Sequence, residues 1–405
     1  MRTRWHLLLA FVIGGTPVVA GVLPDDRADV LYHRYQGGGI TIQGPSVLVR
    51  KKVGDNFSLS AGYYEDMISS ASIDVKLTAS PYKENRKQEN FSVDYLHGKT
   101  TYSAGYIHSR EPDYASNTTF YSLSQDMFGD LTTVSLTYKR GWDRVYKDEK
   151  DAATGQIIND PHFFGGSSSA TADHRGWALG ISQILTRSLL ASFNYELLED
   201  EGYLQSPYRQ IRFLDPTDGK GYRTADQTYP HTRTSNSASL LLKYFLPYRA
   251  AVSGQYRYFQ DTWGIVGHTF EVDYTHPIKR AVPFLFWPVE GHVVLDGSLR
   301  YYRQNAADFY SDLFPRQSYQ NFEARDRELA AFNSYAIGFG ATYEFPQLSW
   351  APWINKSTVN VRLDHLIIDY SDFRAVYTGS GIAPGTEPLY KLNANVFQVF
   401  VSAWY

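Results

Sequence analysis

The sequence predicts an all-β fold, a transmembrane antiparallel β-barrel of 16 strands with 14 strands as the alternative. Three observations support this prediction. Long segments alternate apolar and polar residues with the two-residue period of a β-strand. Long and short connections between these segments fall at opposite rims. The chain also opens with an export-type leader and closes on an aromatic residue.

The clearest pattern is the stretch His231–Trp263, which reads as a long β-hairpin. Its first strand sets an apolar and aromatic face against a face of small, polar or charged residues. The two faces consist of Ala238, Leu240, Leu242 and Tyr244, and of Ser237, Ser239, Leu241 and Lys243. Pro247–Arg249 then turns the chain into a second alternating strand. Strands of about twelve residues exceed the five or six usual in soluble sandwiches and suit an outer-membrane barrel.

Further segments with the same alternation bring the count to sixteen. In chain order they are Val47–Lys52, Phe57–Glu65, Ile73–Ser80, Gln88–His97, Thr100–Arg110, Asn117–Asp126, Leu131–Arg144, His174–Leu185, Ser188–Glu199, His268–Ile278, His292–Gln304, Ala331–Phe345, Ser357–Tyr370 and Leu389–Tyr405. Val47–Lys52 and Ile73–Ser80 are short, and without these two the count is fourteen.

The connections between segments give an independent test of the barrel. Counted from Val47, the long gaps at 145–173, 200–230, 305–330 and 372–388 all follow odd strands. The tight turns at Gly98, Phe128, Thr186 and Pro247 all follow even strands. Outer-membrane barrels have long extracellular loops and short periplasmic turns, so this separation favours that class. The connection Lys279–Gly291 is an exception, because it is long for the periplasmic rim.

The two ends of the chain carry export and assembly signals. Arg2 and Arg4 precede the apolar run Leu7–Val19, and small residues ending at Ala20 complete a secretory signal peptide. About thirteen apolar residues are too few to span a membrane. The last strand alternates apolar residues and ends on Tyr405, which resembles the recognition signal of the barrel-assembly machinery. We therefore expect export to the bacterial outer membrane, with that machinery and outer-membrane lipid as partners.

The residues after the leader show no long alternation. Leu23–Ser46 contains Gly37–Gly39 and reads as a periplasmic lead-in or a small plug in the lumen. The expected organisation is therefore a signal peptide at 1–20, this lead-in or plug at 21–46, and the barrel at 47–405.

Composition excludes several classes of protein. The chain has no cysteine, so disulfides, zinc–thiolate and iron–sulfur sites are excluded. A net charge of −3 gives no basic footprint for nucleic acid. The 32 tyrosines are abundant, and tyrosine is enriched at membrane–water interfaces. No cofactor is expected.

In five blocks the specific residues are informative, and not only their alternation; these blocks are 37–82, 92–109, 125–136, 246–277 and 306–329. In these blocks the chain resembles a proteobacterial family of outer-membrane β-barrel proteins catalogued as a domain of unknown function. The resemblance covers nearly all of the mature chain. It implies the barrel fold and the outer membrane, and it assigns no activity and no site residues.

If the apolar face meets lipid, the charged residues on the opposite face line the lumen. These pore-lining candidates are Asp94, Lys139, Glu196, Lys243, Arg257, Glu271, Asp273, Asp296, Arg300, Arg362 and Asp364. Both signs occur, so the sequence predicts no selectivity ring of one charge. Such residues either form a hydrated, salt-bridged wall or grip a zwitterionic solute at a constriction.

Enzyme chemistry finds little support in the sequence. Asp364 and His365 are adjacent, but the period of a strand sends them to opposite faces, so they cannot act together within one strand. No GxSxG, HExxH, P-loop or GxGxxG context is present. The acids of the 305–330 loop could bind a divalent cation or simply be solvated; they are Asp308, Asp312, Glu323, Asp326 and Glu328.

Three classes of function follow from this reading. The first is a hydrophilic pore or transporter for small solutes, because sixteen strands enclose an aqueous lumen unless loops fill it. The alternative is a scaffold for a periplasmic or secreted partner that binds through Leu23–Ser46. A barrel-embedded hydrolase is the third.

Overall fold

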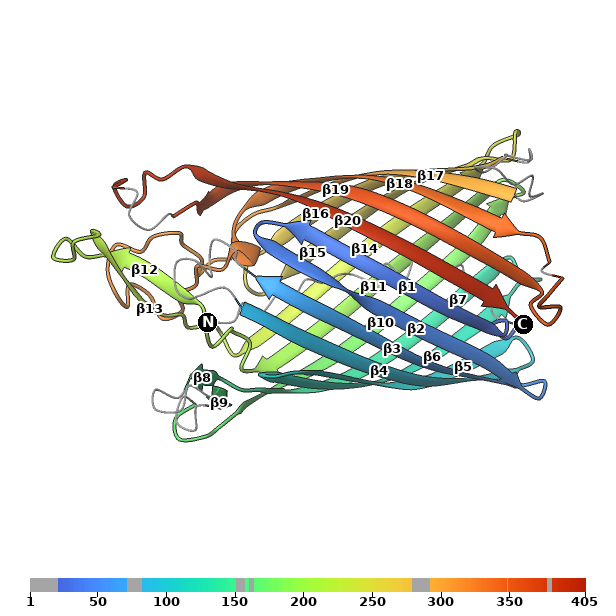
Figure 1. The fold of residues 1–405 in the computed structure, drawn as a ribbon, viewed down its shortest axis with the longest axis horizontal. Helices are drawn as coiled ribbons and strands as arrows, with labels where there is room; N and C mark the ends of the chain where they lie inside the picture. Colours follow the sequence, from blue (N-terminus) through green and yellow to red (C-terminus); the bar gives the residue numbers. More distant parts are fainter. Residues whose placement is uncertain are drawn as a thin grey trace.

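A computed structural model describes residues 21–70, 82–150, 157–159, 164–278, 292–347, 349–376 and 381–405. Sixteen antiparallel strands form one closed barrel (Figure 1). These strands are β1 (Arg27–Gly37), β2 (Ile40–Val53), β3 (Phe57–Ser70), β4 (Tyr82–His97), β5 (Thr100–Glu111), β6 (Tyr114–Met127), β7 (Thr132–Val145), β10 (Ala170–Thr186), β11 (Leu189–Gly202), β14 (Thr232–Phe245), β15 (Ala251–Asp261), β16 (Val266–Ile278), β17 (His292–Gln304), β18 (Phe332–Phe345), β19 (Lys356–Arg374) and β20 (Leu389–Trp404).

The barrel closes between its first and last strands. β1 pairs with β20 in register from Arg27 opposite Trp404 to Gly37 opposite Ala394. Closure satisfies the backbone hydrogen bonds of every strand within the wall, which is what a hydrocarbon environment requires. The predicted count of sixteen strands is therefore confirmed. Within the described residues, no helix is long and apolar enough to cross a membrane.

The expectation for residues 21–46 was wrong. Arg27–Gly37 is the first barrel strand, and the second begins at Ile40. Gly38 and Gly39 make the turn between them with φ of 59° and 81°, a conformation that side chains disfavour. The segment is thus neither a plug nor a free extension that could hold a periplasmic partner.

The alternation of β1 was missed because the part of it nearest the long loops has the opposite pattern to the predicted strands. Tyr35 points inward and is buried, whereas Arg34 and Gln36 point outward and are exposed. A search for apolar residues on the outside and polar residues on the inside cannot find such a strand.

Two predicted features fall on residues that the structure does not describe. The segment Ile73–Ser80 lies outside the described residues, as do the leader and the connection at 279–291. β3 pairs directly with β4 from Phe57 opposite Tyr95 onward. Sixteen strands are therefore reached with Arg27–Gly37 as a member instead of Ile73–Ser80.

The connections segregate between the two rims as the sequence predicts. The four long ones, β7–β10, β11–β14, β17–β18 and β19–β20, share one end of the barrel, here called the long-loop rim (Figure 1). Two small hairpins belong to them, β8 (Asp148–Lys150) with β9 (Ile157–Asn159) and β12 (Gln210–Leu214) with β13 (Tyr222–Asp226). The opposite end, the short-turn rim, carries tight turns such as Gly98–Lys99. Placement of the long-loop rim outside the cell stays a prediction.

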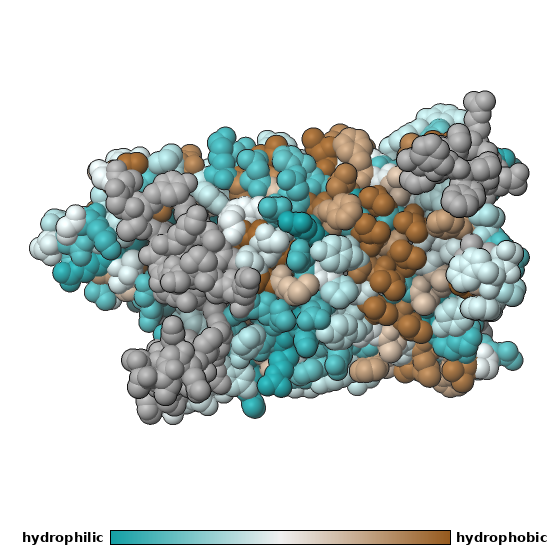
Figure 2. All heavy atoms as spheres, viewed as in Figure 1, coloured by the Kyte–Doolittle hydropathy of each residue, from teal (hydrophilic) through white to brown (hydrophobic). Residues whose placement is uncertain are grey.

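A contact with a loop identifies the inner face of β17. Gln304 on β17 donates hydrogen bonds to the carbonyl oxygens of Glu328 and Ala330, which belong to the β17–β18 loop inside the mouth. Residues on the other face of β17, such as Leu299, are exposed. Leu240, Leu242 and Phe339 are exposed in the same way. Figure 2 shows apolar side chains gathered over the barrel wall toward the short-turn rim and hydrophilic ones over much of the wall nearer the long-loop rim.

Candidate functional site

The charged residues predicted to line the lumen all lie on the face of the wall opposite the exposed apolar side chains. Many bond to small polar neighbours on adjacent strands. Asp94 accepts a hydrogen bond from Ser103 at 2.6 Å, and Asp273 accepts one from Ser253 at 3.1 Å. Arg257 bridges two strands. These contacts describe a hydrated, cross-linked wall, and a pore-lining role for its residues stays a prediction.

Other candidates on the wall also contact neighbouring side chains. Arg257 reaches Ser237 at 3.1 Å and Glu196 at 4.0 Å, and Asp296 accepts from Thr275 at 2.8 Å. Lys243 lies beside the ring of Phe245.

Four candidates have no hydrogen-bond or ion-pair partner among the described residues. These are Lys139, Lys243, Glu271 and Arg300, although Arg300 stands opposite Glu271 in register and lies near the Tyr302 ring. Such side chains remain available to a solute.

On the inner face of β17 to β19, Arg362 and Asp364 of β19 form a contact that reaches across β18 to β17. Arg362 donates to Asp364 at 2.7 Å and to Ser298 of β17 at 2.8 Å. β18 lies between them and presents Gly338 at this point. A Cβ built on Gly338 would lie 2.3 Å from the Asp364 carboxylate and 2.6 Å from the Arg362 guanidinium. Glycine therefore leaves the space through which the Arg362 side chain crosses a strand.

Asp364 and His365 lie on opposite faces, as the alternation predicts. Asp364 bonds to Arg362 on the inner face, whereas His365 contacts Asn395 at 2.8 Å on the outer face. The adjacent pair forms no acid–base unit.

The long loops pack together into a folded cap over part of the mouth. We define the cap as residues 203–231, 305–331 and 381–388. Ala330 of the cap lies in an apolar cluster with inward-facing residues from strands at both sides of the barrel closure, including Ile40 and Leu392. A second cluster joins Tyr229 and Phe309 of the cap to Trp263. The cap therefore has its own apolar core on the rim of the barrel.

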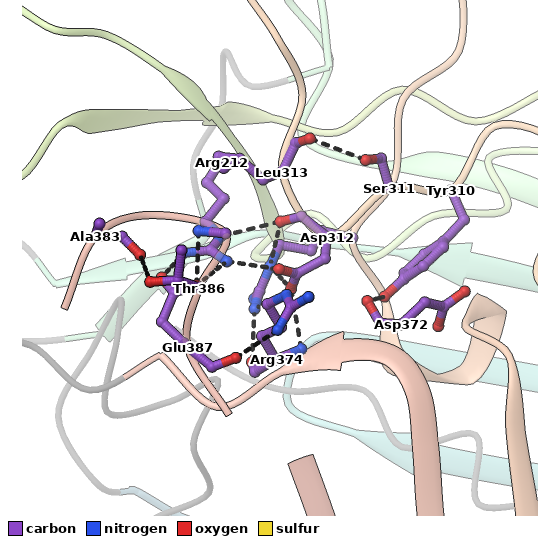
Figure 3. Close-up of polar contacts among 12 residues, drawn as sticks. Arg212, Tyr310, Ser311, Asp312, Leu313, Asp372, Arg374, Ala383, Thr386 and Glu387 are labelled. Atoms are coloured by element: carbon purple, nitrogen blue, oxygen red, sulfur yellow. Dashed lines mark hydrogen bonds and ion pairs between the residues drawn. The ribbon is translucent and has the colours of Figure 1, made fainter. Parts of the chain in front are cut away.

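A buried network of charges ties the three cap segments together (Figure 3). Arg212 on β12 donates to Asp312 at 2.5 Å and to Glu387 at 2.5 Å, and all three side chains are buried. Arg325 donates to Asp312 at 2.8 Å and to the carbonyl oxygen of Arg374 at 3.1 Å. Burial opposes ionisation of Glu387, yet the hydrogen bonds from Arg212 outweigh it and hold the pKa of this carboxyl below its usual range.

A second cap network surrounds Asp326. Arg209 contacts Asp326 at 2.8 Å and also pairs with Glu328, while Tyr229 donates its hydroxyl to Asp326. Burial raises the pKa of Asp326 above its usual range despite the nearby Arg209. The cap acids that could have bound a cation are thus largely engaged with arginines, tyrosine and backbone amides.

Sequence reasoning found the wall residues and missed the cap network. Arg212 and Glu387 lie 175 positions apart, and the sequence carries no signal that joins them. The acids of the 305–330 loop were noted as a cluster, but their arginine partners were not. Within the described residues, no group of three or more His, Cys, Asp or Glu could hold a metal ion.

Two histidine clusters on the inner face were also missed. His33 contacts Asp66 at 2.7 Å, and Tyr64 donates to Asp66 at 2.8 Å. These groups are largely buried, so they are not presented to a solute.

The second histidine cluster joins three strands. His174 contacts Asp143 at 3.0 Å through one ring nitrogen and Asp200 at 2.7 Å through the other. A histidine held by two carboxylates links β7, β10 and β11 below the long-loop rim. Both clusters therefore cross-link the wall.

The chain belongs to the family described as "Protein of unknown function (DUF3570)", which matches residues 73–372. This agrees with the resemblance noted in the sequence. No curated protein matches the chain. A closed barrel with an apolar outer surface is the architecture of outer-membrane proteins, and the chain is an outer-membrane β-barrel.

Several solved structures resemble the chain at low sequence identity. A bacterial polysaccharide outer membrane secretin matches with a TM-score of 0.46 and 8% identity, covering 95% of this chain and 100% of that one. The outer membrane protein opdK from Pseudomonas aeruginosa matches with a TM-score of 0.41 and 10% identity, covering 95% and 100%. A Pseudomonas aeruginosa FadL homologue matches with a TM-score of 0.37 and 10% identity, covering 94% and 90%.

Proposed function

We propose that this barrel is a hydrophilic pore or transporter for small solutes, with the cap controlling access from the long-loop rim. One observation supports this most directly. Lys139, Asn194, Arg257 and Arg300 occupy inner-face positions and are nevertheless exposed to solvent. Side chains packed in a filled barrel would be buried, so their exposure is what a water-filled lumen requires.

The charges on the inner face indicate weak ion selectivity. The eleven wall candidates comprise five bases and six acids, a net charge of −1. Neutralising Arg257, Arg300 and Arg362 together changes this to −4 and should shift permeation toward cations. The reversal potential in a salt gradient measures the shift. An unchanged potential would remove these residues from the conduction path.

In this proposal the cap controls access to the lumen from the long-loop rim. Its three segments are joined by buried ion pairs and by short backbone ladders, such as the antiparallel bridge between Thr228 and Glu323. Solute entry from that side requires either a path beside the cap or separation of the cap segments from one another.

A disulfide across this bridge provides the test. Bridged antiparallel residues have Cα atoms about 5.5 Å apart, within the range that a disulfide spans. The chain has no cysteine, so Thr228→Cys with Glu323→Cys adds the only thiols. Single-channel conductance of the full-length variant in planar bilayers should be lower or rarer when oxidised and recover on reduction.

Each outcome of this experiment has a defined meaning. Equal conductance in the oxidised and reduced states would remove the cap from the proposal and leave an open pore. The variant Arg212→Ala removes the guanidinium that joins two cap segments to β12. If the wild-type protein and this variant are both folded by heat-modifiability on gels and both electrically silent, the pore proposal fails. The Thr228→Cys single variant controls for effects of the reductant.

A further inference from the structure

Among the described side chains, the outer surface of β4 to β10 carries five basic ones that the pore proposal does not use. They are Lys87, Arg110, Arg140, Arg144 and Arg175. Their outward direction follows from their chain neighbours. Arg86 and Glu111 approach each other at 4.0 Å, on the inner face, and Asp143 and His174 bond there as well. The adjacent basic residues must point the other way.

Register brings these residues together on adjacent strands. Lys87 stands directly opposite Arg110, and Arg140 stands directly opposite Arg175. Like charges directly opposite each other destabilise a sheet unless something neutralises them. Only Arg140 of the five has an ion-pair partner among the described residues, Asp173 at 2.7 Å.

Acidic neighbours flank this surface at its two edges. Among the described side chains of β4 to β10, the outward acids above the apolar band are Glu89 and Asp173, which leaves three net positive charges. Glu65 on β3 stands directly opposite Lys87, and Glu199 on β11 stands directly opposite Arg175, so these acids face the outer bases. Arg110 and Arg144 in the centre of this basic patch have no acid directly opposite on either side.

The centre of the patch has the shape of a cradle. Arg110 and Arg144 both pair with Ala115 of β6, one on each side. Two strand spacings separate them by about 10 Å, and the small alanine side chain leaves the space between them open. Two guanidinium groups facing such a gap suit a phosphate, which arginine binds through paired hydrogen bonds.

The height of the patch on the wall selects the ligand. Tyr106 and Phe91 are the last large apolar side chains facing outward on β5 and β4, and both are exposed. Arg110 follows Tyr106 by four residues, a rise of about 9 Å for a strand tilted by about 45°. This level corresponds to lipid headgroups next to the hydrocarbon layer.

We propose that this patch, centred on Lys87, Arg110 and Arg144, binds the phosphorylated headgroup of a lipid A-type glycolipid in the leaflet at the long-loop rim. The lipid phosphates neutralise the like-charged cross-strand pairs, and the acyl chains lie along the apolar wall below. The proposal does not depend on conduction through the lumen.

The test measures retained lipid. Full-length protein folded in phosphatidylcholine bilayers is mixed with lipid A, and native mass spectrometry counts the lipid A bound per barrel. Replacing Lys87, Arg110 and Arg144 by Gln should weaken binding on the order of a hundredfold, since each surface base contributes to anionic lipid attraction. A matched control replaces three outward bases elsewhere, Arg34, Arg303 and Lys391, and should retain lipid A.

A second measurement uses the wild-type protein alone. Lipid A stripped of its phosphates should lose most of its binding, whether or not the patch variant folds. Equal loss in the patch and control variants, or equal binding of phosphorylated and dephosphorylated lipid A, would overturn the proposal. Single-channel conductance should be the same in both variants, which separates this result from the pore proposal.

Discussion

The halves of the barrel next to the short-turn rim and the long-loop rim follow different rules. Near the short-turn rim, the outer face is apolar and the inner face carries small polar and charged groups, as in Leu242 beside Lys243. Near the long-loop rim, where the cap packs against the wall, Tyr35 is buried inside while Arg34 is exposed outside. The pattern of β1 thus reverses along its length, whereas His174 with Asp143 and Asp200 keeps the inner face polar on β7 to β11. The surroundings, lipid below and water or a packed cap above, decide which face is apolar.

The largest expected effect comes from a substitution that disrupts the cap. Arg212→Ala leaves Asp312 and Glu387 buried without their shared guanidinium. Breaking a buried ion pair from one side costs about 3–5 kcal/mol. The cap should open locally while the barrel persists, seen as fast hydrogen exchange at 381–388 with unchanged heat-modifiability. The exposed ion pair of Arg223 with Asp215 gives the control, and Arg223→Ala should leave exchange as it was.

The next effect tests the lipid-facing half. Leu242→Arg places a charge on the exposed apolar face, at a cost of about 2–4 kcal/mol near the membrane midplane. Ser239→Arg places the same charge on the inner face, where it meets water. The folded fraction after refolding into lipid vesicles should fall only for the first variant. Equal folding of both would show that the faces are assigned the wrong way round.

A smaller effect concerns the wall contact over β18. Gly338→Val would place side-chain atoms in the space that Arg362 and Asp364 occupy, and overpacking of this kind costs about 1–3 kcal/mol. Gly297, which has open space around its Cβ position, is the matched control. Urea titration of folded protein in vesicles should separate the two valine variants. Equal midpoints would mean that the Arg362 contact is readily rearranged.

The smallest effect is on pH dependence of the cap. The pKa of Glu387 is held below its usual range, so its ionised form stabilises the cap above that range. This contribution is lost as pH falls through the depressed pKa. The pKa of Asp326 is raised, so its protonation does not work in the same direction. Acid should therefore lower the protection factor at 381–388, which is the intrinsic exchange rate divided by the observed rate at each pH, before it affects 305–331.

The variant Glu387→Gln controls the pH prediction because its side chain cannot titrate. Its protection factor at 381–388 should be lower than that of the wild type at neutral pH and should change little on acidification. If wild-type protein and this variant respond alike to acid, the Arg212–Glu387 pair is not the sensitive group.

The sequence by itself determined the barrel, fifteen of its sixteen strands and the face on which the charged residues of the wall lie. Each of these depends on a period of two within one strand or on the lengths of connections, and both are local properties. The segment Arg27–Gly37 escaped because its pattern is inverted at the long-loop rim, and the inversion depends on loops more than two hundred residues away.

Only the tertiary structure decided the cap, the Arg212–Asp312–Glu387 network and the basic patch around Arg110 and Arg144. The network joins residues 100 and 175 positions apart, and the patch exists only because strand register brings Arg110 and Arg144 to either side of Ala115. Alternation fixes the face on which a side chain lies. Register and loop packing fix its neighbours, because they depend on contacts between distant segments that no local pattern encodes.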